Sequence, residues 1–144
     1  MALVSTTAVG LAELFAVSSR VVLASRVDTV ATFAAESKMA ELRGLTWTYD
    51  PAGTGLSVAD ADLAWSPSST LAGNVDGFAD YVDASGASLG TQPTPARVYV
   101  RRWSIRPLPS DPANALVLQV IATRATRPAS RDVHLVSILA RTAQ

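Results

Sequence analysis

The stretch that decides the fold is Glu36-Ser-Lys-Met-Ala-Glu-Leu-Arg43, which is followed at once by Gly44. It ends a run of 43 residues that contains no proline and a single glycine, Gly10. A run without helix breakers that is closed by a glycine is typical of one continuous helix. At about 1.5 Å per residue such a helix would be roughly 60 Å long, which exceeds the width of a small domain. The sequence therefore predicts a helix over residues 1–43 whose first half projects from the body.

The predicted helix has two chemically different halves. Residues 2–12 carry no charge, and residues 14–19 add a second uncharged block after Glu13. Each block is too short to cross a bilayer, which takes about 20 residues, and no basic flank with a small-residue cleavage site marks an intact signal peptide. From residue 23 onward the pattern is amphipathic, so we expect this half to lie on a core. The predicted packing face consists of Leu23, Val27, Val30, Ala31 and Ala34.

The end of the predicted helix carries three local signals. Gly44 occupies the position where many helices end with a residue in the left-handed conformation. Arg43 places a cation beside the negative end of the helix dipole, and Leu45 supplies the apolar contact that accompanies such an ending. We therefore expect the helix to end at Arg43 and Gly44 to be left-handed.

The rest of the chain reads as β structure. Residues 46–95 are rich in Gly, Pro, Ser, Asn and Asp and must hold one or two short strands or a small helix, whose positions the pattern does not give. Three β-rich runs follow, Ala96–Leu108, Ala115–Thr126 and Asp132–Arg141, and their short connections favour an antiparallel meander. The predicted fold class is α+β, with the long N-terminal helix packed on a C-terminal antiparallel sheet of three to four strands. We expect one domain, divided into a helix over 1–44 (projecting half 1–22, packing half 23–44), a connecting region over 45–95 and a meander over 96–144.

The net charge of zero hides an asymmetry along the chain. Residues 44–96 hold six aspartates and no lysine or arginine, whereas residues 97–144 hold eight arginines and two aspartates. Two interpretations are open: acidic loops fold back on a basic sheet within one subunit, or the two patches meet on neighbouring copies in an assembly. The arginines are spread over several segments without a recognition motif, so nucleic acid is not expected as a partner.

Few residues offer chemistry. The chain has no cysteine, which excludes disulfides, thiolate nucleophiles and cysteine-rich zinc sites. His134 is the only histidine, and we interpret it as structural, because Asp132 and Ser137 are its neighbours along one predicted strand and such residues rarely converge as a triad. Trp103 stands between arginines and serine in a strand pattern, and we expect it to be half-buried with guanidinium groups on its face.

The aspartates of the connecting region leave one alternative open. They could supply oxygen ligands to calcium, but their spacing fits no EF-hand loop, and aspartate and glycine are also the residues that turns require. We therefore predict no bound metal, no cofactor, no catalytic residue and no enzyme activity. The aspartates concerned are Asp60, Asp62, Asp76, Asp80 and Asp83.

The order of these features resembles the type IV pilin and type II secretion pseudopilin superfamily, and more specifically its minor pilins. The resemblance is carried by Glu36–Arg43 at the end of the helix, by Asp76-Gly-Phe78, and by Tyr99-Val-Arg-Arg-Trp-Ser-Ile105 at the start of the sheet. Members of the family begin with a basic leader, a cleaved glycine and an apolar helix that carries a glutamate at a set spacing. Gly10-Leu-Ala-Glu13 does not have that spacing, so we expect the chain to start partway along the family's helix.

The resemblance implies a structural subunit of a type IV pilus or a type II secretion pseudopilus that acts by helix-mediated assembly. Its partners would be other pilin or pseudopilin subunits and, through a missing N-terminal segment, the inner membrane. It would be located in the bacterial inner membrane facing the periplasm, or in a cell-surface filament. The alternative is a soluble or peripheral binding module whose apolar helix docks a partner or a membrane surface. The resemblance assigns Leu3, Val4, Val9, Leu11, Leu14 and Phe15 to the assembly helix.

Overall fold

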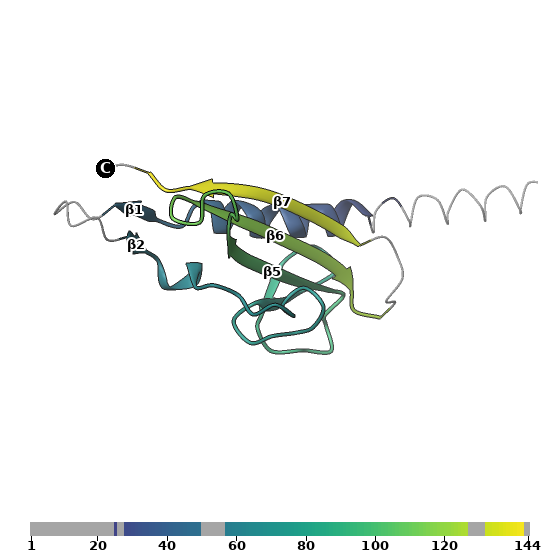
Figure 1. Ribbon diagram of the computed structural model, residues 1–144. Helices are drawn as coiled ribbons and strands as arrows, with labels where there is room; N and C mark the ends of the chain where they lie inside the picture. Colours follow the sequence, from purple (N-terminus) through teal and green to yellow (C-terminus); the bar gives the residue numbers. More distant parts are fainter. Residues whose placement is uncertain (1–24, 26–27, 50–56, 127–131, 143–144) are drawn as a thin grey trace, which may run out of the picture.

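The computed structural model describes residues 25, 28–49, 57–126 and 132–142 (Figure 1). Helical backbone occurs at residue 25 and over residues 28–43, which we call the helix. All other regular elements of the described chain are strands, apart from one short 3-10 helix. In chain order they are β1 (Trp47–Tyr49), β2 (Ser57–Ala59), the 3-10 helix η1 (Ala61–Leu63), β3 (Ala79–Val82), β4 (Ser88–Gly90), β5 (Tyr99–Pro107), β6 (Ala115–Arg124) and β7 (Val133–Ala140).

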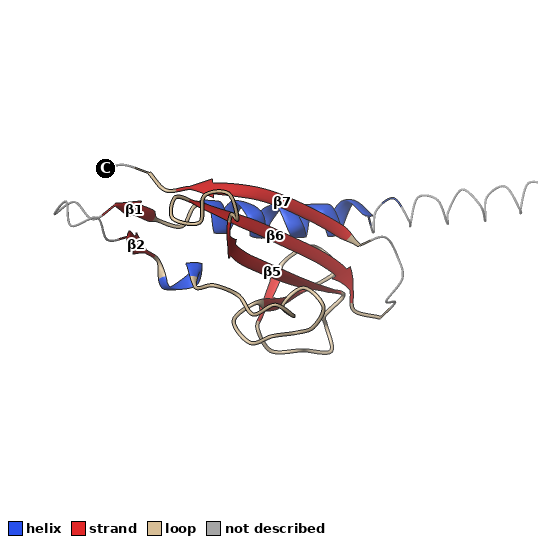
Figure 2. Cartoon of the chain, in the orientation of Figure 1, coloured by secondary structure: helices blue, strands red, loops and turns tan. Residues whose placement is uncertain are grey.

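Five of the strands form one antiparallel sheet, in the spatial order β4-β3-β5-β6-β7. The longest ladder joins β5 to β6, from Tyr99 opposite Arg124 to Pro107 opposite Leu116. β1 and β2 form a separate antiparallel ribbon at one end of the molecule (Figure 2). Thr142, just after β7, pairs with Thr48 of β1 and so ties the ribbon to the sheet.

The helix runs along one face of the five-stranded sheet, behind β6 and β7 in the view of Figure 1. Alternate residues of β6, from Leu116 to Ala122, are buried on this face, as the two-residue period of a strand requires. The helix contributes Ala35, Met39 and Leu42 to the same apolar cluster. Burial of this apolar surface, at about 25 cal/mol per Å², is the main force that holds helix and sheet together.

The predicted fold class is wrong. The described part of the chain is mostly β: its helix covers residues 28–43 rather than 1–43, and its main sheet has five strands rather than three to four. The extra strands β3 and β4 come from the Gly- and Asp-rich region, where runs of three or four residues show too little alternation to be recognised. The part of the predicted helix over residues 1–24, 26 and 27 lies outside the described residues.

The helix ends at Arg43, but the prediction of a left-handed Gly44 is wrong. The described glycines with positive φ are Gly77, Gly86 and Gly90. The amide of Gly44 instead donates hydrogen bonds to the carbonyl oxygens of Ala40 and Glu41, at 3.0 and 3.1 Å. The last turn thus tightens and satisfies two otherwise unpaired carbonyls without a left-handed residue.

β5, β6 and β7 lie within the three β-rich runs of the sequence. β6, next to the edge strand β7, has Leu118 and Val120 fully buried on the helix side, while Val117, Gln119 and Ile121 on the other side are partly exposed. The helix therefore covers one face of the sheet; we call the opposite face, which is partly exposed along β6 and exposed along β7, the open face.

Candidate functional site

The residues predicted for assembly lie outside the described chain. This holds for Leu23 and Val27 of the predicted packing face as well. Of the remaining packing residues, Ala31 and Ala34 are buried and Val30 is partly buried. They form a small apolar cluster with Val82 of β3 and Tyr99 of β5, at the end of the sheet where the helix begins. The residues assigned to the assembly helix that the structure does not describe are Leu3, Val4, Val9, Leu11, Leu14 and Phe15.

An ion pair buried between the sheet and the helix fixes their relative position. Arg101 of β5 binds the carboxylate of Asp80 of β3 with two hydrogen bonds, from Nε over 2.7 Å and from Nη2 over 2.5 Å. Its Nη1 donates to the carbonyl oxygen of Ala34 in the helix over 3.3 Å. The two side chains are only 4% and 9% exposed. The guanidinium of Arg101 therefore connects two strands and the helix. A hydrophobic side chain of the same size would fill the space but would not fix the orientation of these three elements.

Trp103 of β5 lies beneath a lysine rather than beneath the arginines that the sequence suggested. The Nζ of Lys38 lies 3.9 Å from the centre of the Trp103 ring and 2.8 Å from the carboxylate of Glu41. Phe78 packs against the same ring in a tilted arrangement, with the ring centres 6.5 Å apart. Trp103 itself is buried, so it is a packing residue and offers no stacking platform at the surface.

The turn between β3 and β4 docks on the helix. The carboxylate of Asp83 accepts hydrogen bonds from the hydroxyl and amide of Ser85, both at 2.7 Å, and from the amide of Ala87 at 3.0 Å. These bonds, the Ser85 hydroxyl first, lower the pKa of the Asp83 carboxyl below its usual value. Gly86 has a φ of 93° and lies against Phe33, where an added Cβ would meet the ring at 3.0 Å.

The residues considered for catalysis or metal binding do not gather in one place. His134 is exposed, and Ser137 lies on the opposite face of β7, three positions along the strand. The carboxylate of Asp80 forms an ion pair with Arg101, and the carboxylate of Asp83 accepts hydrogen bonds within its own turn. In the described chain no group of three or more histidine, aspartate or glutamate side chains is placed to hold a metal ion.

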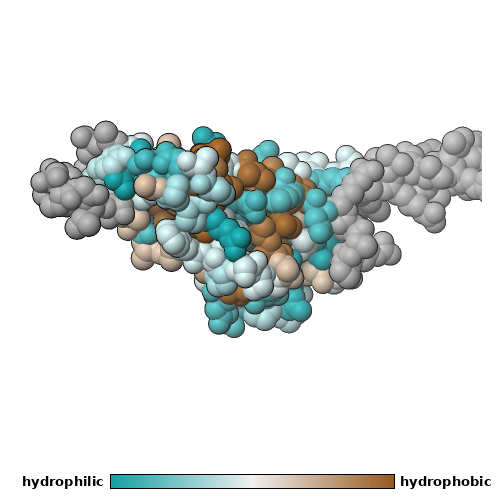
Figure 3. Space-filling model, viewed as in Figure 1, coloured by the Kyte–Doolittle hydropathy of each residue, from teal (hydrophilic) through white to brown (hydrophobic). Residues whose placement is uncertain are grey.

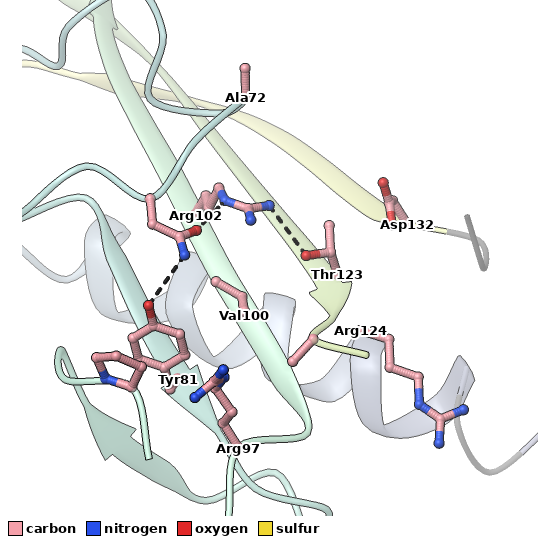
Figure 4. Close-up of a pocket in the computed structure, with 11 residues that line it drawn as sticks. Ala72, Tyr81, Arg97, Val100, Arg102, Thr123, Arg124 and Asp132 are labelled. Atoms are coloured by element: carbon pink, nitrogen blue, oxygen red, sulfur yellow. Dashed lines mark hydrogen bonds between the residues drawn. The ribbon is translucent and has the colours of Figure 1, made fainter. Parts of the chain in front are cut away.

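A pocket of about 580 Å³ opens on the face of the sheet that the helix does not cover (Figure 4). Three arginines line it: Arg97 just before β5, Arg102 within β5, and Arg124 at the end of β6. Among the described lining residues the one acidic side chain is Asp132. The pocket is therefore electropositive, and the charges come from three separate positions in the chain.

Neutral groups hold two of these arginines in place. Arg102 donates from Nε to the side-chain oxygen of Asn74 over 2.8 Å and from Nη1 to the hydroxyl of Thr123 over 3.2 Å. Asn74 donates in turn to the hydroxyl of Tyr81 over 3.2 Å, and Arg97 lies over the Tyr81 ring at 5.8 Å. Figure 4 shows Tyr81, Arg97, Arg102 and Thr123 around the pocket. Since their partners are uncharged, the guanidinium groups are oriented without being neutralised.

The sequence pattern did not predict this pocket. The usable signal was the doublet Arg101-Arg102, because neighbouring strand residues face opposite sides of a sheet and one of the two must face away from the helix. The other lining residues, such as Asn74 and Thr123, are brought together only by strand pairing and by the loop before β3.

The open face also exposes apolar side chains along the edge strand β7 (Figure 3). Val136 is 58% exposed and Ile138 is 56% exposed. On β6, Val117 lies opposite Ile138 and is only partly buried. An apolar surface on the edge strand of a sheet, which β7 is among the described residues, is a common feature of contact surfaces.

Within the described residues, no helix is both long enough and apolar enough to span a membrane. Comparisons with protein-family models, with curated proteins and with solved structures find no match.

Proposed function

We propose that this protein is a structural, non-catalytic subunit of a filament, of the minor pilin or pseudopilin kind, in a type IV pilus or a type II secretion pseudopilus. It acts by assembly with other pilin or pseudopilin subunits. Its place is the bacterial inner membrane facing the periplasm, or a filament at the cell surface. Nucleic acid is not part of this function.

One observation carries the proposal. The three segments on which the resemblance to minor pilins rests are far apart in the sequence, and they meet around the ring of Trp103. Lys38 comes from the end of the helix, Phe78 from the Asp-Gly-Phe segment, and Trp103 from the opening strand of the long meander. Segments that pack on one another as a unit support a common structural origin better than three separate matches of pattern.

The position of the helix supports the same function. It begins at the end of the sheet where β6 ends and β7 begins (Figure 1). Residues 1–24 contain only two charged side chains, Glu13 and Arg20. An apolar segment attached at one end of a folded head can enter a membrane or pack with copies of itself while the head stays in water.

Processing by a prepilin peptidase tests the proposal. The gene is expressed together with the DNA upstream of the Met1 codon, in hosts with and without the peptidase, and the mature N terminus is measured by mass spectrometry. We expect cleavage after an upstream glycine only where the peptidase is present. An identical, unprocessed chain in both hosts would contradict the proposal and favour a binding module that docks a partner or a membrane surface.

A further inference from the structure

We propose that the arginine pocket on the open face of the sheet binds an aspartate-bearing segment of a neighbouring subunit. Two of the arginines that line the pocket, Arg97 and Arg102, have guanidinium groups that neighbouring side chains orient. The partner's identity as a subunit rests on the proposed function, whereas the recognition of a carboxylate rests on the pocket alone.

Arg102 is prepared for an anion. Two of its nitrogens are engaged by Asn74 and Thr123, and in the described chain its Nη2 has no hydrogen-bond partner. A guanidinium that is already held by neutral groups loses little side-chain entropy when it binds, and its planar donors match a carboxylate. This nitrogen is therefore the first contact for the incoming aspartate.

Arg97 supplies the second positive charge. Its Nη1 donates to the carbonyl oxygen of Thr94 over 3.2 Å, and its guanidinium lies over the ring of Tyr81. The side chain is exposed, so a ligand can reach its guanidinium. Tyr81 and the neighbouring Val100 give the pocket an apolar floor between the two cations. A short aliphatic side chain that ends in a carboxylate suits this combination.

The shape and charge of the pocket favour a protein segment over nucleic acid. A polyanion needs a basic stripe that follows several phosphates, whereas here the arginines surround one compact pocket whose edge carries Asp132. The chain as a whole has a net charge of zero.

A second copy of the chain offers such a segment at the opposite end of the molecule. Asp60, which precedes η1, and Asp62, which lies within it, are both exposed, and one carboxylate oxygen of Asp60 accepts a hydrogen bond from the amide of Thr46 over 2.6 Å. They lie near the β1–β2 ribbon, while the pocket lies where β5 starts and β6 ends (Figure 1). A contact between opposite ends of two identically oriented subunits is heterologous and continues from subunit to subunit, as a filament requires.

The test measures binding of an acidic peptide to the full chain, held in nonionic detergent micelles, by fluorescence anisotropy at low ionic strength. The probe is the labelled peptide of residues 59–63, and its control is the same peptide with both aspartates replaced by asparagine. We expect the asparagine peptide to bind about tenfold more weakly or not at all, since a hydrogen bond to a charged group is lost.

Three variants locate the site. Arg102→Gln and Arg97→Gln are each expected to weaken binding about tenfold, whereas Arg106→Gln, on the exposed part of β5 outside the pocket, leaves it unchanged. Arg102→Lys keeps the charge but loses the planar donors, so we expect intermediate affinity. Thermal unfolding of each variant shows whether the fold is retained, and Arg97→Gln, in an exposed loop, keeps the test valid if Arg102→Gln does not fold.

Several outcomes would overturn the proposal. They are equal binding of the two peptides, no binding of either, an equal loss from Arg106→Gln and Arg102→Gln, or tighter binding of inorganic phosphate than of the acidic peptide. Tighter binding of a short single-stranded DNA oligomer at the same salt concentration would assign the pocket to nucleic acid instead. None of these results bears on prepilin processing, so failure here is distinguishable from failure of the proposed function.

Discussion

The two faces of the five-stranded sheet use the same residue types in opposite ways. On the covered face, Arg101 is buried and bound to Asp80 and to the helix. One residue further along β5, Arg102 faces the open side, where its hydrogen bonds go to neutral groups. Likewise Leu118 is fully buried on the first face, and Ile138 is 56% exposed on the second. The strand period sorts side chains to the two faces, and the element that covers a face decides what they do there.

The largest effect is expected from breaking the buried ion pair. Arg101→Leu leaves the carboxylate of Asp80 buried without its partner, so we expect the free energy of unfolding to fall by about 3–5 kcal/mol. Replacing both residues, in Arg101→Leu with Asp80→Leu, removes the stranded charge and should restore a large part of this loss. Unfolding in guanidinium chloride, followed by circular dichroism, measures the free energy of unfolding of the single and the double variant. Arg106→Leu on the exposed part of the same strand is the control, expected within about 0.5 kcal/mol of the wild type.

The apolar residues of the two faces give the second contrast. Leu118→Ala opens a cavity beneath the helix, and we expect a loss of about 2–5 kcal/mol. Ile138→Ala removes a side chain that is already more than half exposed, and its effect should stay within about 0.5 kcal/mol. The same unfolding titration compares them. Similar losses for the two variants would mean that the open face is covered in solution, for instance by a second copy.

The turn between β3 and β4 tests how closely the hairpin is seated on the helix. Gly86→Ala introduces a side chain at a φ of 93° and against Phe33, so we expect a loss of about 1–2 kcal/mol. Gly77→Ala is the matched variant, because Gly77 has a φ of 80° but nothing within 4 Å of the added Cβ. A larger loss at Gly86 than at Gly77 isolates the contact with the helix. Equal losses would show that only backbone strain matters.

The smallest effect concerns the pH dependence of the same turn. The folded pKa of Asp83 lies below its ordinary value of 3.8, so the unfolded chain binds more protons at this group and the stabilisation is present above that pH. It is lost as the pH falls through the lower, folded pKa. We expect Asp83→Asn to lower the melting temperature slightly at neutral pH and to reduce the loss of stability on acidification below about pH 4. Parallel melting curves of wild type and variant across this range measure the difference, and identical curves would show that the turn bonds do not contribute.

Local patterns in the sequence account for part of this structure. The alternation in β5, β6 and β7 is strong because each strand has eight to ten residues, and their positions lie within the runs that the alternation marks. β3 and β4 have four and three residues, too few for a period to be visible among turn residues. The fold class was therefore wrong in both its helix and its sheet, although the helix does end at Arg43.

The candidate site was much less predictable than the strands. Asp80 pairs with Arg101 across 21 positions of the sequence, and Arg102 finds its partners 28 positions before it and 21 after it. Nothing in the local pattern distinguishes the acidic residue that becomes buried from those that stay in exposed turns. The separation of aspartates from arginines along the chain was visible in the sequence. The sequence did not show which aspartate pairs with which arginine within one subunit.

By itself, the sequence determined the strand alternation, the end of the helix, the lack of cysteine chemistry and the separation of aspartates from arginines along the chain. These are local or compositional properties, and a periodic backbone converts them directly into faces and ends. Only the tertiary structure decided that β3 and β4 extend the sheet, that Arg101 is buried with Asp80, and that Arg97 and Arg102 share a pocket. The reason is that burial and pairing depend on which distant segment covers a residue, and that choice belongs to the packing of the whole chain.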